Sequence, residues 1–158
     1  VIVYWGRFEN QLDWGLRWIM THSESAPIRP KIKTGETIHR AFSKRIELWG
    51  EAFKKMQCLA AMRDEAIKVR DRAKHLVKGR DALVHAQWSH FIENGEPRMV
   101  GYQFCHQGEK LLGHEHKVSV LSLIDLSDAI YKLQLKIKPI LHQLAAIPEI
   151  ARGHRKCP

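Results

Sequence analysis

The chain has 158 residues, of which 44% are hydrophobic, and this is enough for one domain with a buried core. Lys and Arg number 26 against 17 Asp and Glu, so the formal charge is +9, which suits a polyanionic partner as well as a solvated basic surface. The three cysteines form no Cys-x-x-Cys pair, and no apolar run reaches the roughly 18 residues of a membrane span, which argues against a disulfide scaffold and a membrane protein. We therefore expect a single domain over residues 1–158, located in the cytoplasm and without membrane attachment.

The first third of the chain predicts two helices joined by a loop. Apolar residues recur every three or four positions over residues 2–21, which indicates an amphipathic helix. Residues 22–35 contain two prolines, two serines and a glycine and predict a loop. Thr34 or Thr37 is expected to cap a second helix that ends near Met56.

The middle of the chain predicts a long charged helix and then a change of pattern. The helix is expected from about residue 59 to residue 84, with Gly79 allowing a kink or a close contact with another helix. Residues 93–97 have the composition of a turn, and β-favouring residues within 99–104 and 118–121 predict a short hairpin between about residues 97 and 121.

A last helix is expected to start near Ser122 or Asp125 and to end before Pro148, with a bend at Pro139. The predicted fold is therefore all-α, a four-helix up-down bundle with a small β-hairpin insertion before the last helix.

The end of the third predicted helix carries the most informative motif, the segment KGRDALVHAQW over residues 78–88. An arginine (Arg80), a polar residue, three variable residues and a histidine (His85) near the end of a long helix resemble the RNase motif of the HEPN superfamily. The segment WGRFENQL over residues 5–12 also looks like the opening of small HEPN-like proteins. The resemblance covers the four-helix plan, but its specific letters cover only these two segments, and Ala86 replaces the more typical glycine.

The spacing itself is weak evidence, because in a chain this rich in arginine and histidine about one such match is expected by chance. Three matches occur, over residues 17–22, 70–75 and 80–85. We favour the third because Leu83 and Val84 anchor it to the core and an aromatic residue follows it.

The predicted chemistry is metal-independent cleavage of RNA. Asp81 and His85 lie one helical turn apart, so Asp81 is expected to accept a hydrogen bond from the imidazole and to fix its tautomer. Arg80 is about 140° from His85 on an ideal helix, but its long side chain can curl toward the same cleft, where its planar fork suits a phosphate. The 2′-OH of RNA is the nucleophile, and the products are a 2′,3′-cyclic phosphate and a 5′-OH end.

The other expected participants are substrate-binding residues and a second copy of the chain. The expected substrate-binding residues are Lys78, Gln87, Trp88 and Glu9, with Trp88 a possible platform for base stacking. No metal and no cofactor is expected. The resemblance implies a homodimer with two motifs across a two-fold axis, and a role as a toxin or defence effector with a cognate antitoxin.

Two alternatives stay open. The same fold can serve as a non-catalytic binding or regulatory module for a nucleotide, an RNA or a protein, with His85 as an ordinary structural histidine. Separately, Cys105, His106, His114 and His116 flank a turn and could offer ligands to zinc, although they match no strict structural-zinc spacing.

Overall fold

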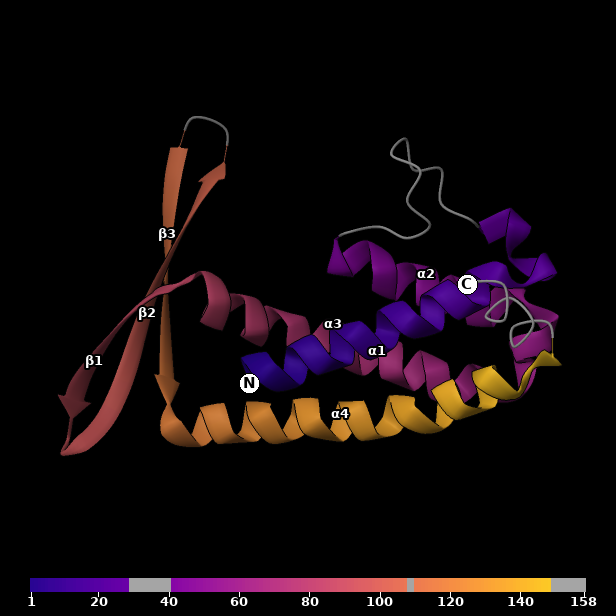
Figure 1. The fold of residues 1–158 in the computed structure, drawn as a ribbon. Coiled ribbons are helices and arrows are strands. Elements are labelled where there is room, and N and C mark those ends of the chain that lie inside the picture. Colours follow the sequence, from indigo (N-terminus) through magenta and orange to yellow (C-terminus); the bar gives the residue numbers. More distant parts are fainter. Residues whose placement is uncertain (29–40, 108–109, 149–158) are drawn as a thin grey trace, which may run out of the picture.

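The computed structural model describes residues 1–28, 41–107 and 110–148, and within these it leaves out the side chains of 96–97, 103–107, 110–112 and 114. Helices account for most of the described chain, with one small sheet at an end of the molecule (Figure 1). The elements in chain order are α1 (Ile2–Thr21), the 3-10 helix η1 (Ser23–Ile28), α2 (Phe42–Lys55), the 3-10 helix η2 (Gln57–Met62), α3 (Arg63–His85), β1 (Gln87–Glu93), β2 (Glu96–Gln107), β3 (Lys110–Ser119) and α4 (Val120–Ala146).

The four long helices do not alternate in direction. The ring of Phe42, at the start of α2, lies 4.9 Å from that of Trp5, at the start of α1, so these two helices run the same way. Gln134 of α4 donates a hydrogen bond to the carbonyl of Tyr4, and α4 runs in this direction too, whereas α3 runs against all three (Figure 1). The helical class is confirmed, but the simple up-down order is not found, because α1 and α2, which follow each other in the chain, run in the same direction (Figure 1).

The core lies between the four helices and η2, and it is built from the apolar stripes that the sequence pattern indicates. On α1, residues at three- and four-residue steps are almost completely buried. The largest fully buried side chains are Trp5, Trp49, Phe8, Phe53, Leu12, Leu16, Ile19, Ile46, Met56, Leu59, Ile130 and Leu133. The buried stripes confirm that burial of one helix face, rather than local propensity alone, organises this fold.

The insertion before α4 contains the expected hairpin, formed by β2 and β3, and it adds a strand that was not expected, β1, so the whole is a three-stranded antiparallel sheet in the order β1-β2-β3. Its first turn, at Asn94 and Gly95, has positive φ at both residues (53° and 78°), as a two-residue hairpin turn of type I′ requires. The turn was expected, but the strand before it, Gln87–Glu93, was missed because its sequence QWSHFIE alternates only weakly between apolar and polar residues.

Helix α4 begins at Val120, earlier than either expected start, because Ser119 caps it by accepting a hydrogen bond from the backbone N–H of Ser122 (3.1 Å). The helix ends at Ala146, before Pro148 as expected, and it curves in the C-terminal part that contains Pro139 (Figure 1). None of the helices in the described ranges is both long enough and apolar enough to cross a membrane.

Two further expectations concern the other helices. The expected close contact at Gly79 is confirmed, because a Cβ there would lie 3.3 Å from Cδ2 of Leu126 on α4. The residues just before α3 form the separate 3-10 helix η2 rather than its first turn. The expected caps Thr34 and Thr37 lie outside the described residues.

Candidate functional site

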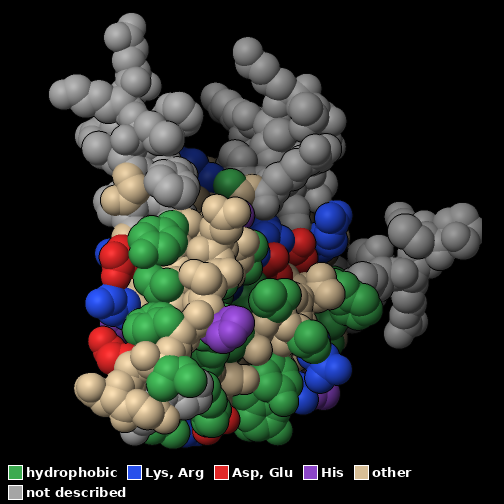
Figure 2. Space-filling view, turned by 90° about the vertical axis from the view of Figure 1, so that its left-hand side faces the viewer, with side chains coloured by type: hydrophobic (Ala, Val, Ile, Leu, Met, Phe, Trp, Pro, Cys, Tyr) green, Lys and Arg blue, Asp and Glu red, His purple; other side chains and the backbone are tan. Residues whose placement is uncertain are grey.

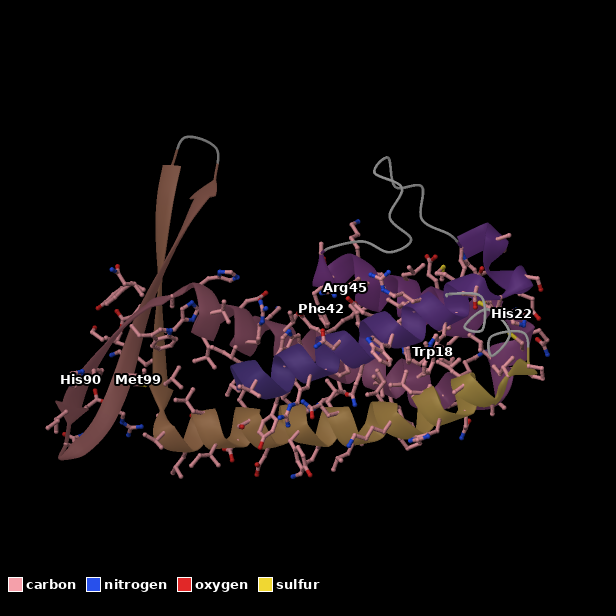
Figure 3. All side chains as sticks on the ribbon, viewed as in Figure 1. Trp18, His22, Phe42, Arg45, His90 and Met99 are labelled. Carbon is pink, nitrogen blue, oxygen red and sulfur yellow. The ribbon has the colours of Figure 1, made fainter. Side chains whose placement is uncertain are left out.

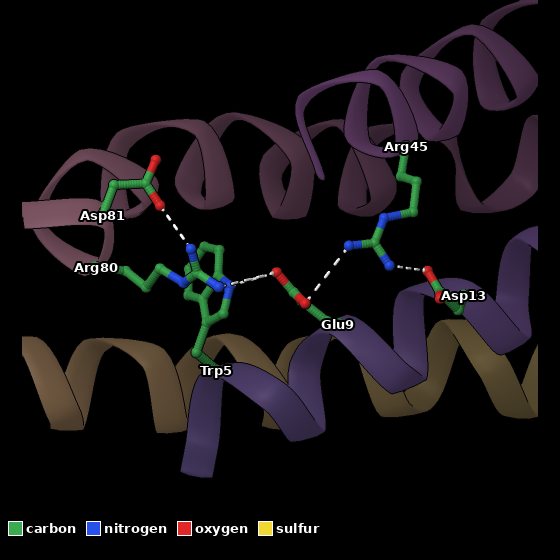
Figure 4. A network of polar contacts seen from close by, with 6 residues as sticks. All are labelled: Trp5, Glu9, Asp13, Arg45, Arg80 and Asp81. Atoms are coloured by element: carbon green, nitrogen blue, oxygen red, sulfur yellow. Dashed lines mark hydrogen bonds and ion pairs between the residues drawn. The ribbon is translucent and has the colours of Figure 1, made fainter. Parts of the chain in front are cut away.

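Arg80 lies near the C-terminal end of α3 and turns its side chain toward α1 (Figure 4). Its Nη1 donates a hydrogen bond to Oδ1 of Asp81 (2.7 Å), and its Nη2 lies 3.8 Å from Oε1 of Glu9. Its guanidinium carbon lies 5.9 Å from the ring centre of Trp5, and Nε1 of Trp5 donates to the same Glu9 oxygen (2.7 Å). The guanidinium is therefore held by two carboxylates and an indole ring, which fixes its orientation.

The same network continues to a second arginine, on α2. Nη2 of Arg45 lies 3.4 Å from Oε2 of Glu9, and its Nη1 donates to Oδ1 of Asp13 (2.6 Å). Arg45 is only 8% exposed, and its Nε has no hydrogen-bond partner among the described residues. Glu9 thus links two arginines from two helices, and it belongs to the packing of the bundle as much as to any binding surface.

The expected hydrogen bond between Asp81 and His85 is absent, although both residues are described. Oδ1 of Asp81 instead accepts from Arg80, its neighbour in the chain. His85 is exposed at the last position of α3, and no hydrogen bond or ion pair joins it to another residue in the described part of the chain. Asp81 was expected to fix the tautomer of His85, and this expectation is wrong. In this structure Asp81 orients Arg80 instead.

The other expected substrate-binding residues have different surroundings. Lys78 and Gln87 are exposed, one before and one after the motif. Trp88 is half-buried: its Nε1 donates to the carbonyl of Leu83 (3.0 Å), and a Cβ at Gly101 would lie 2.8 Å from its ring. Trp88 thereby joins the end of α3 to β2, which is a structural role.

The helical geometry separates the two main motif residues. Five residues along a helix rotate the second by about 140° from the first, so Arg80 faces α1 while His85 points away into solvent. Lys78, seven residues before His85, shares the face of His85. It lines a 510 Å³ pocket between α3, β3 and the start of α4, together with His116 and Lys117.

An apolar surface adjoins the motif on the other side. Leu83 and Trp88 contribute to a pocket of 610 Å³ formed with the start of α1 and the start of α4. Around it, five apolar side chains are at least half exposed, and we call them the apolar end patch: Ile2, Val3, Val120, Leu121 and Ile124. Hydrophobic side chains are visible over this end of the molecule, where the sheet lies (Figure 2).

The two competing Arg-x4-His matches have other surroundings. In the match over residues 70–75, Nε and Nη2 of Arg70 both bond to Asp71 and its Cδ lies against Gly50, while His75 is exposed. In the match over residues 17–22, the histidine is buried at the C-terminal end of α1.

That buried histidine, His22, belongs to a cluster that the sequence did not predict. His22, Glu24 and Cys58 offer one ligand atom each, and these three atoms lie within 4.8 Å of one another. The only signal in the sequence is His-x-Glu in a polar segment and a cysteine more than thirty residues later, a spacing that matches no zinc motif. Of the residues that could offer ligands to zinc in the hairpin, Cys105, His106 and His114 have side chains outside the described residues, and His116 is half-buried.

Comparison of the chain with protein-family models, with curated proteins and with solved structures finds no match. The likeness to HEPN ribonucleases therefore depends on the two sequence segments alone, residues 5–12 and 78–88.

Proposed function

We propose that this helical protein is a metal-independent endoribonuclease of HEPN type. In the proposed site, His85 transfers protons and Arg80 binds the phosphate. The observation that carries the proposal is that one end of α3 carries both an exposed histidine and an arginine that Glu9 and Asp81 hold in one orientation. A fixed guanidinium loses little freedom when it binds a phosphate, and an exposed imidazole is accessible to an RNA hydroxyl group.

The proposed reaction needs no group outside the chain and the RNA. His85 removes the proton of a ribose 2′-OH, and the oxygen attacks the adjacent phosphorus. The bond from phosphorus to the 5′-oxygen breaks, and a protonated histidine supplies the proton of the new 5′-OH. Arg80 stabilises the negative charge that builds up on the phosphoryl oxygens.

A single chain presents one His85, turned away from Arg80, so we propose that the active form is a homodimer. Two copies related by a two-fold axis supply one histidine as base and one as acid. The apolar end patch is the proposed interface, since it adjoins the motif through the pocket that Leu83 and Trp88 line, and exposed apolar surface favours association. The occupant to which the proposal commits is a second copy of this chain.

Incubation of the purified protein with 5′-labelled RNA in EDTA tests the chemistry. Wild type should produce 2′,3′-cyclic phosphate and 5′-OH ends. His85→Ala should abolish cleavage without unfolding the protein, because His85 is exposed, and Arg80→Lys should fail because an ammonium group cannot replace the bidentate fork. His75→Ala, an exposed histidine on the same helix in a competing match, is the control and should leave cleavage intact. An equal loss of RNA cleavage in His75→Ala and His85→Ala contradicts the assignment of His85 as the group that transfers protons.

The resemblance also implies a biological role, a toxin or defence effector held in check by a cognate antitoxin. Induced expression of wild type should then arrest bacterial growth, and His85→Ala should relieve the arrest. Growth arrest by both forms contradicts a toxicity that depends on RNA cleavage.

One observation favours the alternative, a non-catalytic binding module. Both terminal nitrogens of Arg80 already face carboxylates, and Asp81 does not contact His85. A phosphate must therefore share Arg80 with Glu9 and Asp81. RNA binding that Arg80→Lys weakens, with no cleavage by wild type at any protein concentration, would establish the binding module instead.

A further inference from the structure

A cluster of metal-ligating side chains lies at the end of the molecule opposite the sheet, where His22 is labelled in Figure 3. His22 follows the last residue of α1, and its backbone N–H caps that helix by donating to the carbonyl of Ile19 (3.1 Å). Glu24 lies in η1 and Cys58 in η2, so two 3-10 helices from distant parts of the chain meet here. The proposed ribonuclease site, on the sheet side, uses none of these residues.

The three residues are already linked to one another. Sγ of Cys58 lies 3.7 Å from Nδ1 of His22, and the backbone N–H of Glu24 donates to the same Nδ1 (3.2 Å). The carboxylate of Glu24 reaches across to η2, where its Oε2 accepts from the backbone N–H groups of Gln57 (2.6 Å) and Cys58 (3.3 Å). His22 is 5% exposed, so its ring cannot turn freely to a different arrangement.

We propose that Nδ1 of His22, the carboxylate of Glu24 and Sγ of Cys58 bind a zinc ion. A tetrahedral ion with bonds of about 2.3 Å to sulfur and about 2.05 Å to nitrogen separates those two ligand atoms by about 3.6 Å. The observed separation of Sγ and Nδ1 is 3.7 Å, and all three ligand atoms fall within 4.8 Å. The fold therefore holds the sulfur and the nitrogen at the spacing that zinc needs, with a carboxylate oxygen of Glu24 close to both.

The chemistry of the three groups selects zinc among common cations. A thiolate with an imidazole and one carboxylate suits borderline-soft zinc, whereas magnesium and calcium prefer oxygen ligands alone. Nδ1 accepts a hydrogen bond, so it carries the lone pair that a metal needs, and that long bond from Glu24 N–H is exchanged for the metal. A carboxylate has about four acceptor positions, so the two backbone bonds to η2 leave room for an ion.

Zinc at this position would join η1 to η2 and so fix the end of α1 against the segment that leads into α3. Such a link stabilises the folded chain because the unfolded chain does not hold the three ligands together. The role is structural and is consistent with metal-independent RNA cleavage at the other end.

Cobalt substitution tests the site, because a cysteine thiolate bound to Co²⁺ gives an intense charge-transfer absorption. The full chain, stripped of metal and titrated with Co²⁺, should show this band with a tetrahedral visible spectrum and one ion per chain, and zinc should displace it. Cys58→Ser should abolish the band. The matched controls Cys105→Ser and Cys157→Ser should keep it, which separates this site from the other two cysteines.

Stability gives a second readout that does not depend on colour. Zinc at 100 times its Kd should raise the Tm of wild type by about 5–10 °C. Glu24→Gln can keep its hydrogen bonds to η2 but loses the charge, so it should fold and respond to zinc with at least a tenfold weaker apparent affinity. The proposal is overturned if the charge-transfer band is absent, if it survives in Cys58→Ser, or if zinc changes neither the Tm nor the rate at which iodoacetamide alkylates Cys58.

Discussion

Glu9→Gln is the perturbation that most directly tests the polar network around Arg80. The carboxylate lies 3.4 Å from Nη2 of Arg45 and 3.8 Å from Nη2 of Arg80. At an effective dielectric constant near 20, each pair attracts by about 4–5 kcal/mol, and most of this is offset by the cost of taking the charges out of water. The amide of Gln keeps an oxygen that accepts from Nε1 of Trp5 but carries no charge.

The expected loss is about 1–3 kcal/mol of the free energy of unfolding, the usual worth of a hydrogen bond to a charged group, because Asp13 and Asp81 still neutralise the two arginines. For a chain of this size that lowers the Tm by roughly 2–12 °C. Circular dichroism in urea and on heating measures both quantities. If the variant also cleaves RNA more slowly than wild type, with Arg80 and His85 unchanged, Glu9 acts on the reaction by positioning Arg80.

Glu65→Gln is the matched control, since it removes the same charge from an exposed ion pair. Nζ of Lys68 donates to Oε1 of Glu65 (2.6 Å), and this hydrogen bond and then the charge of Lys68 lower the pKa of Glu65 below 4.5. Stabilisation from a lowered carboxyl pKa is present above pH 4.5 and is lost as the pH falls through the folded-state pKa. The two side chains are 61% and 64% exposed, so at about 150 mM salt the variant should keep the Tm of wild type. Equal Tm values for the Glu9 and Glu65 variants would refute the structural role of Glu9.

Two further predictions concern stability: one tests the packing of α1 at Gly15, and the other tests the cap of α4 at Ser119. Gly15→Ala should lower the free energy of unfolding by about 1–2 kcal/mol, because the new Cβ would lie 2.7 Å from the fully buried ring of Trp49, and this overpacking exceeds the gain in helix propensity. Gly6→Ala on the same helix, with nothing within 4 Å of the new Cβ, should instead be neutral or stabilise by up to about 1 kcal/mol, and a loss in both variants contradicts this reading. Ser119→Ala should lower the free energy of unfolding by about 0.5–2 kcal/mol, because it removes the hydroxyl that caps the backbone N–H of Ser122. Amide hydrogen exchange in the first turn of α4 should then become faster. Unchanged exchange in that turn would show that the helix does not need this cap.

The helices could be predicted from the sequence because burial imposes a periodic pattern on it. The expected range 2–21 for the first helix is the range of α1, and the expected end of α4 before Pro148 is also confirmed. The starts were less accurate where a cap or a change of helix type decides them, as at Ser119 and in η2. Such boundaries depend on single hydrogen bonds, which leave little trace in the apolar pattern.

The sheet and the polar network could not be predicted from local pattern. β1 has no clear alternation, since it lies at an edge of a sheet that adds little to the core, so pairing with β2 rather than its own sequence defines it. Arg45 and Asp13 are 32 residues apart in the chain, and only the parallel packing of α1 and α2 brings them together. Asp81 was expected to bond to His85 because the two are one turn apart, but the charged guanidinium of Arg80 is the stronger donor and lies nearer.

The placement of Arg80 and His85 determines how the motif can act. Arg80 turns toward α1, while His85 turns into solvent about 140° away around α3, so one phosphate cannot readily contact both within one chain. A two-fold axis removes this difficulty, because the histidine of one copy can face the arginine of the other. We therefore expect RNA cleavage to require the dimer. A charged residue introduced into the apolar end patch should abolish both dimer formation and RNA cleavage.

Ile124→Glu tests this dependence, because Ile124 is 51% exposed and lines the pocket beside the motif. The variant should be monomeric in light scattering and should not cleave RNA, but it should keep the weak, salt-sensitive RNA binding of a basic chain. Leu135→Glu, 44% exposed on nearly the same face of α4 about three turns away, is the control and should remain a dimer that cleaves RNA. A monomeric Ile124→Glu that cleaves at the wild-type rate would show that one chain brings Arg80 and His85 to the same phosphate, and the two-fold site would be wrong.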